Sequence, residues 1–76
     1  MSQTWRINAT VTINEDKFSP HTGEYRARSY SAAFRQMCRY VEIESRKGDT
    51  VRTVGIELSR AERIGRGGRV IEEIQG

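Results

Sequence analysis

Arginine is the residue type that offers most chemistry in this sequence. The 76-residue chain carries thirteen basic side chains against ten acidic ones, a net charge of +3, and all the basic residues except Lys17 and Lys47 are arginine. The guanidinium group presents a planar set of donors that suits phosphate, carboxylate and aromatic groups. This composition predicts a surface that meets an anionic partner. A GC-rich genome also encodes abundant arginine, and the same net charge is ordinary for solubility, so both explanations stay open.

Two groups of arginines are the candidate partner-binding residues. The first consists of Arg6, Arg26 and Arg28. We expect these three to lie together on adjacent strands, beside Asn8 and Thr10, because cross-strand neighbours on one sheet face are close in space. The second group is spaced by three and consists of Arg60, Arg63, Arg66 and Arg69. Glycines among the second group favour a mobile basic arm over a helical stripe, and nearby glutamates would neutralise part of its charge.

The nucleophilic and titratable residues form no catalytic pattern. His21 is the sole histidine and falls in a polar segment expected to be a surface loop, and the chain has no nucleophile elbow. Cys38 falls in an apolar stripe, where a small core residue is expected rather than a reactive thiol. The glycines between Arg66 and Arg69 lack the lysine and the serine or threonine of a phosphate-binding loop. We therefore expect no enzymatic activity and no cofactor.

Composition also excludes several classes of protein. One cysteine and one histidine cannot supply an internal disulfide or an ordinary zinc site, so no metal is expected. No apolar stretch approaches the length of a membrane span, and the first residues have no apolar signal core. A chain of this length forms one small domain, here residues 1–76. We expect a cytoplasmic protein that does not bind membranes.

Apolar periodicity predicts the elements that position these residues. Trp5 to Asn14 alternates strictly between apolar and polar, which indicates a strand with one wet face. Glu15 to Gly23 is expected to be a loop, and Glu24 to Arg28 a second, antiparallel strand. A helix capped by Ser29 should follow. Its apolar stripe, which must dock on the sheet, consists of Tyr30, Ala33, Phe34, Met37, Cys38 and Val41.

The segment after Val41 has two interpretations. The helix could continue to Lys47 and end at Gly48. Alternatively, a strand starts near Val41, turns at Lys47-Gly48-Asp49 and returns from Thr50 to Leu58. We prefer this hairpin because its apolar residues alternate, whereas the helix would leave Ile43 on its wet side.

The tail carries a helix-start signal. Ser59 followed by Glu62 is a capping box, which predicts a short helix from Arg60 that ends at Gly65. Val70 to Ile74 is favoured as a closing edge strand. The sequence as a whole predicts an α+β fold. It comprises an antiparallel sheet of three to five strands, one main helix packed on one face, and a short C-terminal helix or strand.

The order strand, strand, helix resembles that of small bacteriophage-encoded anti-CRISPR proteins. The likeness covers Trp5 to Val41, about half the chain, with the segment ARSYSA from Ala27 to Ala32 at the junction. It implies a non-catalytic inhibitor in the host bacterial cytoplasm. Such a protein docks on a CRISPR-Cas surveillance complex or nuclease and blocks target nucleic-acid binding or nuclease recruitment. The alternative is a small basic nucleic-acid-binding regulator, and a third possibility is a dimeric structural protein that pairs through an exposed edge strand. The protein could accordingly be a monomer or a homodimer.

Overall fold

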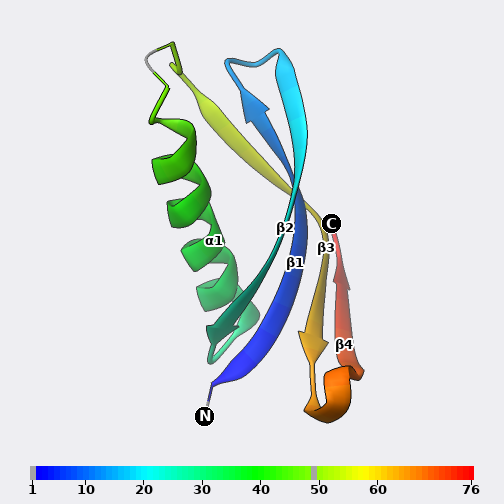
Figure 1. The fold of residues 1–76 in the computed structure, drawn as a ribbon. Coiled ribbons are helices and arrows are strands. Elements are labelled where there is room, and N and C mark those ends of the chain that lie inside the picture. The colour runs from blue at the N-terminus through cyan, green and yellow to red at the C-terminus, as the bar shows by residue number, and fades with distance from the viewer. Residues whose placement is uncertain (1, 49) are drawn as a thin grey trace.

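A four-stranded antiparallel sheet carries one helix against one of its faces (Figure 1). The computed structural model describes residues 2–48 and 50–76. The sheet order is β2-β1-β3-β4. The elements are β1 (Gln3–Ile13), β2 (Lys17–Ala27), α1 (Tyr30–Ser45), β3 (Val54–Ile64), the short 3-10 turn η1 (Arg66–Gly68) and β4 (Val70–Gln75). The predicted α+β class and strand number are confirmed.

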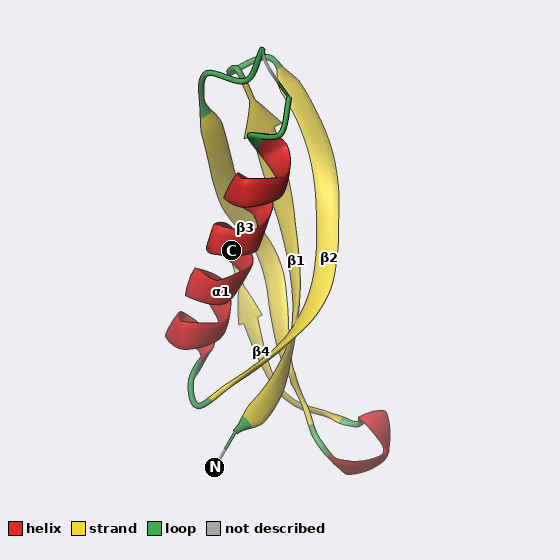
Figure 2. Ribbon diagram, turned by 60° about the vertical axis from the view of Figure 1, so that its left-hand side comes forward, coloured by secondary structure: helices red, strands yellow, loops and turns green. Residues whose placement is uncertain are grey.

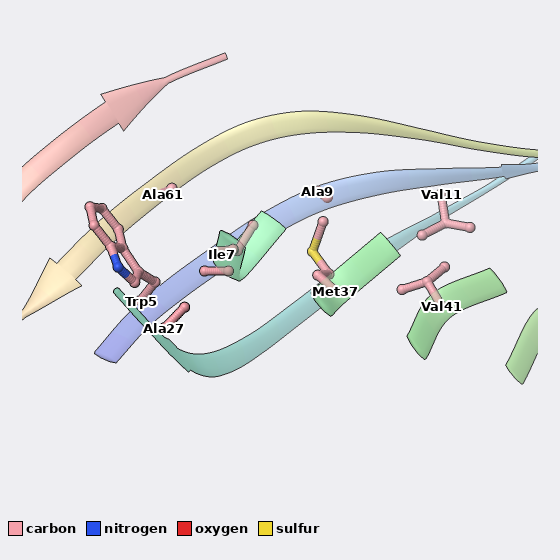
Figure 3. Packing of buried hydrophobic residues seen from close by; sticks show 9 residues of the cluster. Trp5, Ile7, Ala9, Val11, Ala27, Met37, Val41 and Ala61 are labelled. Carbon is pink, nitrogen blue, oxygen red and sulfur yellow. The ribbon is translucent and has the colours of Figure 1, made fainter. Parts of the chain in front are cut away.

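The core lies between β1 and α1, where two apolar periodicities meet (Figure 3). Alternate residues of β1 point toward the helix, and one residue in each turn of α1 points back toward β1. Ile7 and Met37 are fully buried, with 0% of their surface exposed. The other buried apolar residues are Trp5, Ala9, Val11, Ala27, Ala33, Val41 and Ala61. The cap is also as predicted, because the Ser29 hydroxyl accepts a hydrogen bond from the Ala32 N–H at 3.2 Å.

Strand β2 is much longer than the sequence suggests. Only residues 14–16 form the turn, so the predicted loop from Glu15 to Gly23 is wrong over most of its length. β2 is an edge strand, and its polar side chains and Pro20 are tolerated because one of its edges has no neighbouring strand. The turn is tight, with positive φ values of 54° at Asn14 and 66° at Glu15.

The preferred hairpin after the helix is wrong, and the helical alternative is the observed one. α1 continues to Ser45, and Arg46 is its C-cap. Val41 extends the buried row of the helix, and an ion pair of 3.0 Å between Glu42 and Arg46 spans its last turn. Ile43 is left 58% exposed, as the sequence required of a helix here. Asp49 of the predicted turn lies outside the described residues, and the next strand begins at Val54.

The predicted C-terminal helix is wrong, because β3 runs through it. The register of β3 against β1 shifts between Arg60 and Leu58, which leaves Ser59 as a bulge. The bulge changes which side chains face α1, so that Ala61 rather than Arg60 enters the core. Tertiary packing of Ala61 thus overrides the local capping signal.

The glycine-rich segment is a tight connection between β3 and β4, not a mobile arm. Gly67 and Gly68 have φ values of 74° and 80°, a conformation that favours glycine, and they let the chain reverse over η1. β4 follows as the predicted closing edge strand. Among the described residues, α1 is neither long nor apolar enough to cross a membrane.

Candidate binding surface

The predicted patch of Arg6, Arg26 and Arg28 is only partly assembled. Arg6 and Arg26 belong to the face of the sheet that α1 does not cover. Arg6 is directly opposite Glu24 on β2, whereas Arg26 is opposite Thr4 and Arg28 follows the end of the strand. Arg6 forms ion pairs with Glu24 at 3.2 Å and with Glu62 at 3.8 Å. Its charge is therefore engaged internally, while Arg26 and Arg28 are exposed and have no ion pair within the described residues.

Ion pairs cross the uncovered face from one edge of the sheet to the other. Arg60 lies 2.9 Å from Glu62 and 3.1 Å from Glu73 of β4, which extends the pairs made by Arg6. Signs alternate along this charge ladder, which consists of Glu24, Arg6, Glu62, Arg60 and Glu73. Glu62 is its central member and only 7% exposed. The face expected to be cationic is thus largely neutralised.

The second predicted group is divided in the same way. Arg60 belongs to the charge ladder, and Arg63 pairs with Glu72 of β4 at 3.1 Å. Arg66 and Arg69 are exposed around η1, and no ion pair involves them in the part of the chain that the structure describes. The expected stripe of four arginines therefore does not form.

A cationic surface on α1 was not predicted from the sequence. Arg35 and Arg39 are exposed one turn apart, and neither forms an ion pair with a described residue. They belong to an open groove of about 550 Å³, which we call the helix flank, lined by Ala32, Arg35, Gln36, Arg39, Tyr40 and Ile43. Tyr40 is 53% exposed although it is aromatic. The spacing of Arg35, Arg39, Tyr40 and Ile43 outside the apolar stripe was the signal that could have revealed this surface.

α1 lies over one face of the sheet, and β2 is the outer strand on one side of that sheet (Figure 2). The contacts of Gln36 and Tyr40 place the helix flank beside this strand. The Gln36 side chain donates a 2.9 Å hydrogen bond from Nε2 to the carbonyl oxygen of Arg26. One turn further on, the Tyr40 ring lies 6.1 Å from the His21 ring, between centroids. A second hollow of about 290 Å³ is lined by residues 21–25 of β2 and by Tyr40. The two hollows share Tyr40, so helix and strand edge form one surface.

The titratable side chains near this surface are held in place by packing. His21 lies on β2 rather than in the predicted loop, and its Nε2 is 2.8 Å from the Tyr25 hydroxyl. Burial raises the pKa of Tyr25, and Tyr40 and Cys38 add to the shift. Burial, and then the Glu42 carboxylate, raise the pKa of Cys38 and oppose its ionisation. Cys38 packs against the core, as the sequence predicted.

No group of three metal-ligating side chains lies close enough together in residues 2–48 and 50–76 to hold a metal ion.

No protein-family model, curated protein or solved structure matches the chain. The likeness to anti-CRISPR proteins therefore stays a prediction, and the functional inference rests on the surface itself.

Proposed function

We propose that the chain is a non-catalytic binding protein that docks on an acidic surface of a partner protein. The contact surface is the helix flank together with the neighbouring end of β2. One observation carries this proposal: the fold divides its arginines into two sets. On the uncovered sheet face Arg6 and Arg60 are paired with glutamates, whereas Arg35, Arg39 and the predicted anchors Arg26 and Arg28 are exposed and unpaired in the described structure.

The composition of the helix flank favours a protein partner over a nucleic acid. Tyr40 and Ile43 are exposed and line the same groove as Arg35 and Arg39. Aromatic and aliphatic side chains next to arginine are typical of the energetically important centre of protein interfaces. A phosphate backbone would use the arginines but would leave Ile43 without a counterpart.

The identity of the partner is proposed from the resemblance alone. A phage-type inhibitor would use the helix flank to occupy an acidic patch of a CRISPR-Cas surveillance complex or nuclease. It would thereby block target binding or nuclease recruitment. The chemical part of the proposal, an acidic protein surface, does not depend on that identity.

Charge reversal on the helix flank tests the proposal. A tagged protein is used to capture its partner from host lysate, and the purified partner is then titrated with variants at fixed ionic strength. Arg35→Glu with Arg39→Glu should weaken binding by about tenfold or more, which corresponds to about 1.4 kcal/mol. The matched control is Arg66→Glu with Arg69→Glu, which makes the same charge change on exposed, unpaired arginines at η1.

Two results would contradict the proposal. The first is equal affinity of the helix-flank variant and the wild type, with normal circular dichroism. The second is tight binding of duplex or single-stranded nucleic acid at low salt that is lost steeply as salt rises, because this behaviour reports the neutralisation of phosphates. That second result would establish the nucleic-acid alternative.

A further inference from the structure

Alternate backbone groups of β2 point away from the sheet. In an antiparallel strand, the N–H and C=O of one residue point to the same side, and successive residues alternate. The Arg26 carbonyl accepts its hydrogen bond from Gln36 on the helix. Pro20 is even-numbered like Arg26 and has no backbone N–H, yet β2 pairs with β1 at this position. The pairing is possible because the even-numbered residues of β2 do not donate to β1. Just after β1, the N–H of Asn14 donates to the carbonyl oxygen of Thr53, which precedes β3. The even-numbered residues of β1 therefore direct their backbone groups toward β3, and the odd-numbered ones direct theirs toward β2.

These observations define a short unpartnered length of backbone. The even-numbered residues of β2 direct their N–H and C=O groups outward. Pro20 interrupts this row because it lacks a donor, and Gln36 occupies the carbonyl of Arg26. Between these points Thr22 and Glu24 each offer both groups, and Arg26 offers its N–H. We call Thr22 to Arg26 the open edge.

The surroundings of the open edge are suited to an acidic strand. Arg35 and Arg39 lie along the helix flank, on the side of the edge that α1 covers. By the alternation of β2, the Arg26 side chain belongs to the opposite face of the sheet. Arginine side chains thus lie on both sides of the edge, and Tyr40 gives an apolar contact beside it. The Glu24 carboxylate lies on the same face as Arg26, and Arg6 pairs with it at 3.2 Å.

We infer that an extended acidic segment of the partner adds to β2 as a fifth strand at the open edge. Its backbone bonds to Thr22 and Glu24, and alternate side chains enter the helix flank. This mode of recognition takes affinity from main-chain hydrogen bonds and specificity from every second side chain. The inference rests on the proposed function and specifies how the same surface holds its partner. A second copy of the chain is disfavoured at this place, because it would bring further arginines against Arg35 and Arg39.

The test uses synthetic peptides and amide hydrogen exchange. An extended peptide of about seven residues alternating Glu and Val is titrated into the isotope-labelled protein, with a Lys and Val peptide as the control. Only the acidic peptide should bind. On saturation, the amides of Thr22 and Glu24 should exchange at least about tenfold more slowly, whereas those of His21 and Gly23, which face β1, should change little.

Backbone variants separate strand addition from simple charge attraction. Thr22→Pro removes an outward N–H two residues from the existing Pro20, and should weaken binding of the acidic peptide by about tenfold. Thr22→Val is the matched control, since it removes only the hydroxyl that donates to Asn8 Oδ1 at 2.7 Å and keeps the N–H. Pro20→Thr restores a donor and should strengthen binding.

The outcomes distinguish this inference from the proposed function. Peptide binding that is lost in the Arg35→Glu, Arg39→Glu variant but leaves the Thr22 and Glu24 amides unprotected overturns strand addition and leaves the proposed function standing. No binding of the acidic peptide at millimolar concentration also overturns strand addition. A homodimer that Thr22→Pro dissociates would assign the open edge to a second copy. Circular dichroism of the Thr22→Pro and Thr22→Val variants checks that both are folded.

Discussion

Glu62 is the residue at which the charge ladder can be tested most directly. The substitution Glu62→Gln removes the central negative charge and keeps an amide oxygen that can accept from Arg60. Glu62 lies 2.9 Å from Arg60 and 3.8 Å from Arg6, so the nearer contact dominates. A hydrogen bond between charged groups contributes about 1.5 to 3 kcal/mol when well enclosed.

Solvent reduces this figure. The Arg60 and Arg6 side chains are 47% and 39% exposed, so water screens both pairs and solvates the guanidinium groups after the change. We therefore expect Glu62→Gln to lower the free energy of unfolding by about 1 to 2 kcal/mol. For a domain of this size, each kcal/mol lowers Tm by about 4 to 8 °C.

Urea unfolding followed by the fluorescence of the buried Trp5 measures this loss. The matched control is Glu72→Gln, which breaks the 3.1 Å pair with Arg63, and Glu72 is 50% exposed. Its effect should stay within about 0.5 kcal/mol. Equal losses in the two variants would refute the reasoning that burial at the centre of the ladder sets the energy. A fully stable Glu62→Gln variant would show that the ladder contributes nothing.

Three further perturbations probe the core, the turn and the thiol. Met37→Ala should cost about 2 to 5 kcal/mol in urea unfolding, because Met37 is fully buried; a loss below 1 kcal/mol, about what one buried CH₂ contributes, would contradict the packing. Glu15→Gly should raise unfolding free energy by about 1 kcal/mol, because Glu15 has a φ of 66°, and a destabilised variant would contradict this. Cys38 should react with iodoacetamide more slowly in the folded protein than in urea, and faster as pH rises, because its thiol pKa is raised by burial and Glu42. Because the folded protein favours the neutral thiol, the contribution of Cys38 to the free energy of unfolding is present below the thiol pKa of the unfolded chain and is lost as the pH rises through the higher pKa of the folded protein. Equal rates of iodoacetamide reaction in the folded and unfolded protein would argue against burial of the thiol.

The parts of the fold that the sequence predicted correctly are those with two unlike faces. β1 alternates between core and solvent, and α1 buries one row that includes Met37, so periodicity identifies both. β2 has no such contrast over Lys17 to Gly23, because an edge strand with polar side chains resembles a loop in sequence. The capping box at Ser59 failed for another reason: the bulge there reverses the alternation, and the burial of Ala61 outweighs a local helix signal.

The candidate site was harder to predict than the fold. Residue type showed that arginine would dominate the surface, but not which guanidinium groups remain available. That depends on which carboxylates stand opposite them, and hence on strand register. Arg6 meets Glu24 only because the turn at residues 14–16 fixes the pairing of β1 with β2. Arg35 and Arg39 are available because α1 docks in a way that places no carboxylate against them. The sequence alone does not specify this docking.

Register therefore links the core to the binding surface. A shift of β2 by one residue would turn Tyr25 and Ala27 away from the core face and would separate Arg6 from Glu24. The apolar contacts of Ala27, which is 6% exposed, oppose such a shift. The packing that fixes this register thus also pairs the charges on the uncovered face. It directs the backbone groups of Thr22 and Glu24 away from β1, and it leaves unpaired arginines beside the open edge. Selection for a well-packed core would in this way also maintain the surface on which the proposed partner binds.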